Sequence, residues 1–269
     1  MKVNTGTQVN HRRHQSLAWM VVATALVLAA PGTQAQEKDA KVILKTMADY
    51  VASQKTIELS FDSDIEVITP ELEKIQFTNS GEALLSRPGK LRAHRVSGHT
   101  EVLMVFDGKM VSILGKNLNG YAQFEAPGTV DQLIAALRAG HGVALPGADL
   151  LLSNSYEVLV AGVKEAKHIG RGIIDGVECE HLAFRNFDTD WQLWVEVGER
   201  PIPRKMVITS KTVNSAPQYT LRVKGWKTGV EPAPDAFAFV PPANATKLSP
   251  DALIELDELP QDSTTGETK

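Results

Sequence analysis

The sequence predicts a mainly β fold, in which one antiparallel sheet curls into a closed or half-closed barrel and two helices lie against its concave face. Three observations predict this fold. Apolar and polar residues alternate along many segments, short turns join consecutive segments, and two other segments repeat apolar residues at three- and four-residue steps. Consecutive strands with short connections favour one antiparallel sheet. A sheet of about eleven strands cannot stay flat, because its strands twist.

The N-terminal residues predict an export signal. Basic side chains within residues 11–14 precede an uncharged apolar run over residues 17–30, and a chain-breaking Pro-Gly pair and Ala35 follow it. A membrane-spanning helix needs roughly 20 apolar residues, so this run is too short to span a bilayer and is typical of a signal peptide. We therefore expect residues 1–35 to be removed by cleavage after Ala35. The mature chain is expected in the periplasm.

The composition argues against a nucleic-acid partner and against an internal disulfide. The chain has a formal net charge of −4, and the predicted signal carries basic residues but no acidic ones, so the mature chain is more acidic still. The sequence contains no basic stripe with interleaved aromatic residues, and we expect no nucleic-acid partner. The single cysteine cannot form an internal disulfide. A lone cysteine in an oxidising compartment is usually buried and inert.

The first half of the predicted fold is one helix followed by strands. Apolar residues at helical spacing predict a helix over residues 39–53, which Asp39 can cap. An Asp107–Gly108 pair marks a hairpin turn. Alternating residues predict strands over residues 56–67, 75–85, 91–96, 102–106 and 110–114.

A second helix is expected over residues 129–139. Thr129 can cap its start, and Leu133, Ile134 and Leu137 form one apolar face. A short apolar segment follows the helix at residues 146–152.

Strands resume after this segment and complete one domain over residues 36–248. The acidic segment 249–269 is expected to be largely disordered. The pattern predicts strands at 156–163, 168–173, 177–185, 191–197, 204–211 and 219–226, with a last short strand at 237–240.

The stretch GVECEHLAFR, residues 176–185, holds Cys179 two positions before His181. On a strand the two side chains share one face, and three interpretations are open. The pair belongs to a structural strand, to a redox-active or nucleophilic thiol next to an imidazole, or to a metal site. The structural strand is favoured, because glutamates flank Cys179 and no other histidine lies at a ligand spacing.

No sequence motif points to an enzyme. The patterns G-x-S-x-G, H-E-x-x-H, G-x-G-x-x-G and the P-loop are absent from the sequence. We expect no catalytic residue, no bound metal and no cofactor.

Trp191 and Trp194 lie three residues apart on one predicted strand, so they face opposite sides of the sheet. One of them therefore points away from the main core. Two interpretations are open for that tryptophan. It packs beneath a helix or loop, or it lines a cavity or a partner surface.

Several stretches of the chain resemble a known family. They are RPGKLRAHR, FDGKMVSIL, YAQFEAPGTVDQLIAAL, GVECEHLAFR, DWQLWVEVGERPIPRKMVITSK and PQYTLRVKGW. Together they resemble a family of predicted periplasmic proteins, which is similar to the lipoprotein-carrier superfamily that includes LolA, LolB and LppX.

The resemblance implies an incomplete antiparallel barrel of about eleven strands, with helices that plug its concave face. It also implies a hydrophobic cavity that takes acyl chains, with residues 129–139 as its lid. We expect the cavity to involve Leu133, Ile134 and Leu137 of the lid and Phe61, Phe77, Trp191 and Trp194 of the sheet.

These observations favour a non-enzymatic periplasmic binding protein for a hydrophobic or amphiphilic ligand, such as a lipid or an acylated protein. We expect the protein to be a monomer. The alternative is an envelope regulatory module of the same fold that binds another envelope protein. An enzyme centred on Cys179 and His181 is disfavoured, and a filled barrel without any ligand is a further alternative.

Overall fold

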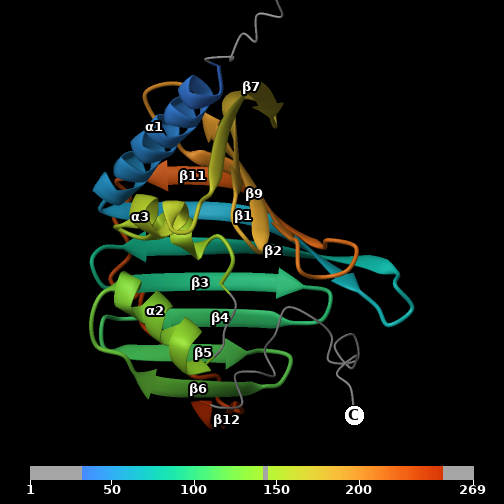
Figure 1. Cartoon of the computed structure of the whole chain (residues 1–269). Coiled ribbons are helices and arrows are strands. Elements are labelled where there is room, and N and C mark those ends of the chain that lie inside the picture. Colours follow the sequence, from blue (N-terminus) through green and yellow to red (C-terminus); the bar gives the residue numbers. More distant parts are fainter. Residues whose placement is uncertain (1–31, 142–144, 251–269) are drawn as a thin grey trace, which may run out of the picture. The chain divides into compact units, whose positions relative to one another are not determined.

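The computed structural model describes residues 32–141 and 145–250 of the chain. Its centre is one twelve-stranded sheet (Figure 1), with the strand order β12-β6-β5-β4-β3-β2-β1-β11-β10-β9-β8-β7. The strands are β1 (Thr56–Ile68), β2 (Lys74–Ser86), β3 (Lys90–Ser97), β4 (Glu101–Phe106), β5 (Met110–Gly115), β6 (Gly120–Glu125), β7 (Glu165–Ile174), β8 (Val177–Arg185), β9 (Thr189–Glu196), β10 (Pro203–Ser210), β11 (Gln218–Thr228) and β12 (Thr246–Lys247).

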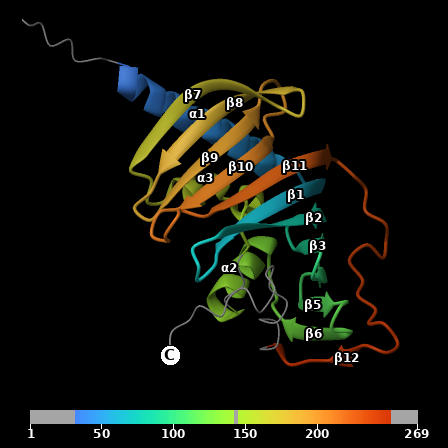
Figure 2. The same ribbon diagram turned by 90° about the vertical axis from the view of Figure 1, so that its right-hand side faces the viewer.

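Two antiparallel meanders make up this sheet. Strands β1 to β6 pair in chain order, strands β7 to β11 do the same, and β1 pairs with β11 where the meanders meet. Of the described strands, β12 alone runs parallel to its neighbour, β6. The sheet curves but stays open, because β7 and β12 end the order and do not pair with each other (Figure 2). The expected incomplete barrel is confirmed, with twelve strands.

The first helix, α1 (Gly32–Ser53), packs across β7, β8 and β9 (Figure 2). It begins earlier than the predicted helix, so the expected cleavage position after Ala35 falls in its first turn. Within the described residues, no helix combines the length and the apolar character that crossing a bilayer requires. The buried face of α1 consists of Ala40, Leu44, Met47, Ala48 and Val51.

Three shorter helical segments lie on the concave side of the sheet (Figure 1): α2 (Val130–His141), the 3₁₀ helix η1 (Ala148–Leu151) and α3 (Ser155–Val160). A capping box starts α2. The Thr129 hydroxyl accepts a hydrogen bond from the Gln132 N–H at 3.2 Å, and the Gln132 side-chain oxygen accepts one from the Thr129 N–H at 2.8 Å. The predicted helix over residues 129–139 is therefore confirmed.

The structure corrects the predicted strand at residues 156–163, where it has α3. Ser155 and Leu159 are both buried, and their spacing of four residues places them on one face of a helix. A short apolar run rich in β-branched residues does not distinguish a buried helix from a strand.

The structure also corrects the predicted strand at residues 237–240, where a turn over residues 234–237 is followed by irregular chain. The Phe237 ring is buried and lies 5.7 Å from Lys90 Nζ. The short strand in this part of the chain is β12, beside β6, and the sequence pattern predicts neither of these two strands.

Candidate functional site

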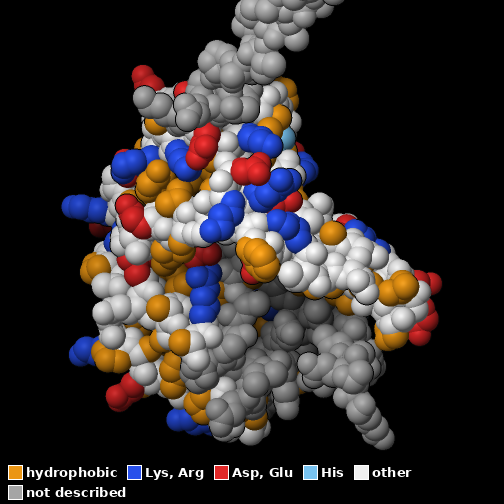
Figure 3. All heavy atoms as spheres, in the orientation of Figure 1, with side chains coloured by type: hydrophobic (Ala, Val, Ile, Leu, Met, Phe, Trp, Pro, Cys, Tyr) orange, Lys and Arg blue, Asp and Glu red, His pale blue; other side chains and the backbone are white. Residues whose placement is uncertain are grey.

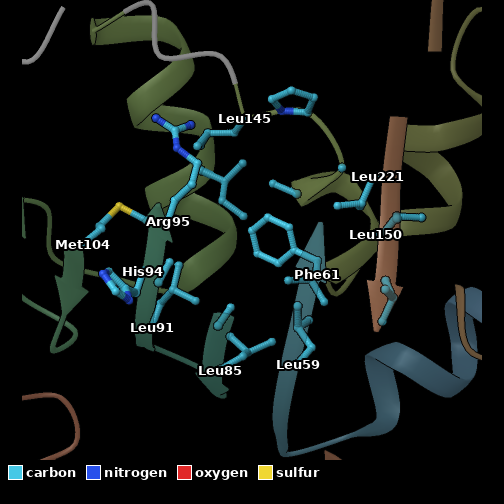
Figure 4. Close-up of a pocket in the computed structure, with 18 of the residues that line it drawn as sticks. Leu59, Phe61, Leu85, Leu91, His94, Arg95, Met104, Leu145, Leu150 and Leu221 are labelled. Atoms are coloured by element: carbon cyan, nitrogen blue, oxygen red, sulfur yellow. The ribbon is translucent and has the colours of Figure 1, made fainter. Parts of the chain in front are cut away.

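An apolar cavity of about 240 Å³ lies on the concave face of the sheet (Figure 4). Strands β1 to β5 and β11 supply its floor, and α2 and residues 145–151 supply its roof. Viewed from this side, Lys and Arg side chains alternate with Asp and Glu over the upper part of the surface, above a hollow (Figure 3). Apolar residues of the floor include Leu59, Phe61, Leu85, Leu91, Met104, Leu221 and Trp226.

Phe61 reaches the centre of the cavity because a glycine lies beside it. Phe61 on β1 pairs with Gly81 on β2, and a Cβ atom at Gly81 would lie 2.4 Å from Cζ of the Phe61 ring. The absence of a side chain at Gly81 therefore lets the ring lie over the sheet. Figure 4 shows the ring between Leu85 on one side and Leu150 on the other.

Polar bonds at the rim tie α2 to the second roof segment. Arg138 Nη1 lies 2.6 Å from Asp149 Oδ1, and Arg138 Nη2 donates to the Leu145 carbonyl at 3.1 Å. At the other end of α2, the Asp131 carboxylate accepts hydrogen bonds from the Ser153 N–H and the Ser153 hydroxyl. The roof is thus one unit held by polar contacts at its edge, with apolar residues beneath it.

Arg87 anchors this roof to the rest of the fold. Its Nη2 donates to the Leu151 carbonyl at 2.7 Å, and its Nε donates to the Gln54 carbonyl, just beyond α1, at 3.1 Å. Burial lowers the pKa of the Arg87 guanidinium from its ordinary value, and the nearby Asp131 carboxylate opposes this shift. One side chain in the Arg-Pro-Gly turn therefore joins α1, η1 and the sheet.

The structure places the residues predicted for the cavity in different surroundings. Phe61 and Ile134 line the cavity. Leu133 and Leu137 are buried in the apolar core but are not among the residues that line it. Phe77 lies farther along β2, where its ring packs edge to face against His99 at 5.8 Å.

The two tryptophans face opposite sides of the sheet, as predicted, and neither lines the cavity. Trp191 belongs to the core, stacks on Phe184 at 3.9 Å and donates to Asn186 Oδ1 at 3.2 Å. Trp194 stacks on the His181 ring at 4.1 Å, and Lys205 Nζ lies 5.0 Å from its centroid. The outward tryptophan is therefore packed between side chains of neighbouring strands.

Cys179 and His181 lie on one face of β8, and each has its own partners. The Cys179 side chain is 0% exposed, and its Sγ lies 3.5 Å from the Val177 carbonyl. His181 Nε2 lies 2.9 Å from Gln192 Oε1. Burial raises the pKa of the Cys179 thiol, an effect opposite to that in an activated nucleophile. The arrangement favours the structural interpretation of this stretch.

Cys179 is expected to react with iodoacetamide roughly a hundredfold more slowly in the folded protein than in urea, because the thiol is reached only through local opening. It is the one cysteine of the chain, so the labelled mass reports on this site alone. A time course by intact-mass spectrometry measures both rates. Equal rates in the two conditions would restore the nucleophile interpretation.

In the part of the chain that the structure describes, no group of three or more His, Cys, Asp or Glu residues is arranged so that it could hold a metal ion.

Sequence reasoning missed much of the cavity wall. Arg95, Met104 and Tyr219 line it, as do residues 145–148. Alternation places Arg95 on the same face of its strand as Leu91, which is the signal that could have found it. The short apolar segment after α2 was a second signal for the roof.

Comparison with known proteins supports a family but identifies no close relative. No curated protein sequence matches the chain. A structure of an uncharacterized conserved protein from Thermus thermophilus is 11% identical, with a TM-score of 0.48, over 78% of this chain and 99% of that one. LprF from Mycobacterium bovis is 13% identical, with a TM-score of 0.45, over 77% and 100%. Lipoprotein LppX from Mycobacterium tuberculosis is 11% identical, with a TM-score of 0.38, over 72% and 98%.

With TM-scores below 0.5, nothing about a ligand follows from these similarities. A sequence-family model is more informative, because it matches residues 40–249, from the buried face of α1 to the residues just after β12. The chain therefore belongs to the family described as predicted periplasmic protein DUF2092.

Proposed function

We propose that this protein is an exported, non-enzymatic binding protein that holds a hydrophobic or amphiphilic ligand in the cavity beneath α2. The observation that supports the proposal is a cavity of about 240 Å³ lined almost wholly by apolar side chains. Apolar cavities of this kind stay dry and accept apolar ligands. Burial of a twelve-carbon chain, at ~0.8 kcal/mol per methylene, is worth on the order of 10 kcal/mol before the cost of ordering it.

The construction of the roof also supports the proposal. Its polar contacts lie at the rim, from Arg138 to Asp149 and from Asp131 to Ser153, whereas Ile134 and Leu150 face the cavity. Rim contacts of this kind can break and re-form in water at a small net cost, because water replaces the lost hydrogen bonds. The polar contacts at the rim would therefore oppose opening of the roof only weakly.

Export through a signal peptide of residues 1–35 is part of the same proposal. Cleavage after Ala35 leaves the buried face of α1, from Ala40 to Val51, in the mature chain. Residues 36–248 then form the binding domain, followed by the acidic segment 249–269. Residues 1–31 and 251–269 lie outside the described part of the chain.

Native mass spectrometry of the protein purified from a periplasmic extract tests the proposal. We expect a chain that begins at Gln36 and carries adducts of lipid mass. Ala93→Phe fills the cavity from its floor, and overpacking of ~1–3 kcal/mol is expected to lower the ligand-bound fraction roughly tenfold. Ala183→Phe is the matched control, because Ala183 is also half-buried on a strand but lies outside the cavity.

Two outcomes would contradict the binding function. The first is a wild-type protein without any adduct, and the second is an equal loss of adduct in the two Phe variants. A stoichiometric protein partner without lipid would favour the alternative, an envelope interaction module.

A further inference from the structure

Three neighbouring hairpins place their turns at one end of the sheet. They join β1 to β2, β10 to β11 and β8 to β9, and the antiparallel pairing of these strands brings the three turns to the same end. Hydrogen bonds tie each hairpin to the next. The Lys211 N–H donates to the Asp188 carbonyl at 2.8 Å, and the Gln218 N–H donates to Glu66 Oε2 at 2.8 Å. The three turns, which we call the turn edge, therefore lie together on the molecule.

Every turn of this edge exposes a large apolar side chain. Phe187 is 86% exposed between β8 and β9, Val213 is 47% exposed between β10 and β11, and Leu72 is 64% exposed between β1 and β2. The β1–β2 hairpin extends beyond the strand pairing on either side of it and projects from the sheet (Figure 1). Figure 3 shows hydrophobic and acidic side chains next to one another on this projection.

Leu72 also has a backbone conformation that disfavours leucine. Its φ angle is 67°, in the left-handed region, where glycine, asparagine or aspartate fits with less strain. Because the side chain is exposed, little packing within the described protein offsets this strain. A strained residue without a structural benefit points to a role outside the fold.

The arrangement of the turn edge suits a lipid surface better than a protein partner. The turns of successive hairpins lie two strand spacings apart, about 10 Å, so their apolar side chains do not form one continuous patch. The core of a protein interface is such a patch. A lipid surface accepts each side chain separately, because headgroups and acyl chains rearrange around it.

The backbone of these turns is prepared for a surface that is poor in water. The Leu72 N–H donates to the Thr69 carbonyl at 2.9 Å, and the Ala216 N–H donates to the Val213 carbonyl at 3.0 Å. Amides that already have partners within the chain lose little when water is withdrawn.

The charges of the turn edge favour a zwitterionic lipid over an anionic one. Exposed carboxylates lie beside the apolar side chains, on Glu71, Glu73 and Asp188. The lysines next to the turns are already paired, since Lys74 Nζ lies 3.1 Å from Glu66 Oε2 and Lys211 Nζ lies 3.3 Å from Asp190 Oδ1. The edge therefore carries surplus negative charge, which an anionic surface repels. The outermost charged group of a zwitterionic phospholipid is an ammonium, and it complements these carboxylates.

The β1–β2 hairpin also connects the turn edge with the cavity. Ile65 pairs with Phe77 and Val67 pairs with Ile75, and all four side chains belong to the same face of the hairpin as Phe61. An apolar stripe, interrupted by one polar row, therefore extends from the turn edge towards the cavity.

We propose that the turn edge docks this protein on a zwitterionic phospholipid surface, with Phe187, Leu72 and Val213 inserted among the headgroups. The inference goes beyond the proposed binding function and does not depend on which ligand the cavity holds.

Flotation of the mature protein with lipid vesicles tests the inference. We expect binding to phosphatidylcholine vesicles that high salt leaves unchanged, because insertion of apolar side chains is not screened. Binding to phosphatidylglycerol vesicles should be weaker at low salt. Phe187→Ser and Leu72→Asn should each lower the partition coefficient on phosphatidylcholine about tenfold, as the loss of one inserted apolar side chain implies.

Ile173→Ser is the matched control, because Ile173 is 66% exposed but lies beside the β7–β8 turn, at the opposite end of the sheet. This variant should bind vesicles as the wild type does. Leu72→Asn should unfold at an unchanged or higher urea concentration, since asparagine tolerates the left-handed region, so its loss of vesicle binding would not reflect a loss of fold. No binding of the wild type to phosphatidylcholine, stronger binding to phosphatidylglycerol, or an equal loss in Ile173→Ser would overturn the inference. These outcomes leave the test of the cavity ligand untouched.

Discussion

Replacement of Leu44 by alanine is expected to lower the free energy of unfolding by about 2–5 kcal/mol. Leu44 is 0% exposed in the middle of α1, and it belongs to the same core cluster as Leu182 and Leu193 of β8 and β9. Removal of its side chain leaves a space that a rigid sheet cannot fill. Urea denaturation monitored by circular dichroism measures the change as a shift in midpoint at constant slope.

Val42 provides the control for this experiment, because it lies on the opposite side of the same helix and is 55% exposed. Val42→Ala is expected to change the free energy of unfolding by less than about 0.5 kcal/mol. Similar small effects for both variants would mean that α1 is not part of the cooperative core. In that case the concave face of β7 to β9 would be covered in another way.

Strands β1 to β5 and β7 to β11 were predictable because their sequence signals are local. The Asp175–Gly176 turn has positive φ angles at both residues, 48° and 81°, as a two-residue hairpin turn between twisted strands requires. At Asp107–Gly108 the Asp107 carboxylate accepts hydrogen bonds from the Lys109 and Met110 N–H groups. Alternation along β1 and β2 then sets which residues face the cavity.

The cavity was not predictable to the same degree, because it depends on contacts between distant segments. Leu133, Ile134 and Leu137 form one apolar face of α2, yet only Ile134 reaches the cavity. A side chain that lines a cavity and one that fills a core have the same sequence pattern. The Arg87–Leu151 bond joins residues 64 positions apart, and no local pattern encodes it.

The second large effect is expected at this bond. Arg87→Met should lower the free energy of unfolding by about 2–4 kcal/mol, because two charge-assisted hydrogen bonds are lost and the Leu151 and Gln54 carbonyls lose their donor. Methionine keeps an apolar stem of similar reach, so the loss reports on the guanidinium. Arg87→Lys should be intermediate, since an ammonium cannot reproduce the guanidinium's fork of donors.

Arg171→Met is the control for lost charge, because Arg171 is 56% exposed and pairs with Glu178 and Glu180 on the surface. Surface ion pairs contribute at most about 1 kcal/mol.

Amide hydrogen exchange separates a local effect of the Arg87 substitution from a global one. In Arg87→Met, the amides of Leu150 in the roof and of Leu152 just after it should exchange faster by a larger factor than amides in the centre of β9. Uniform acceleration across the protein would mean that Arg87 supports the whole fold and has no particular role in holding the roof closed over the cavity.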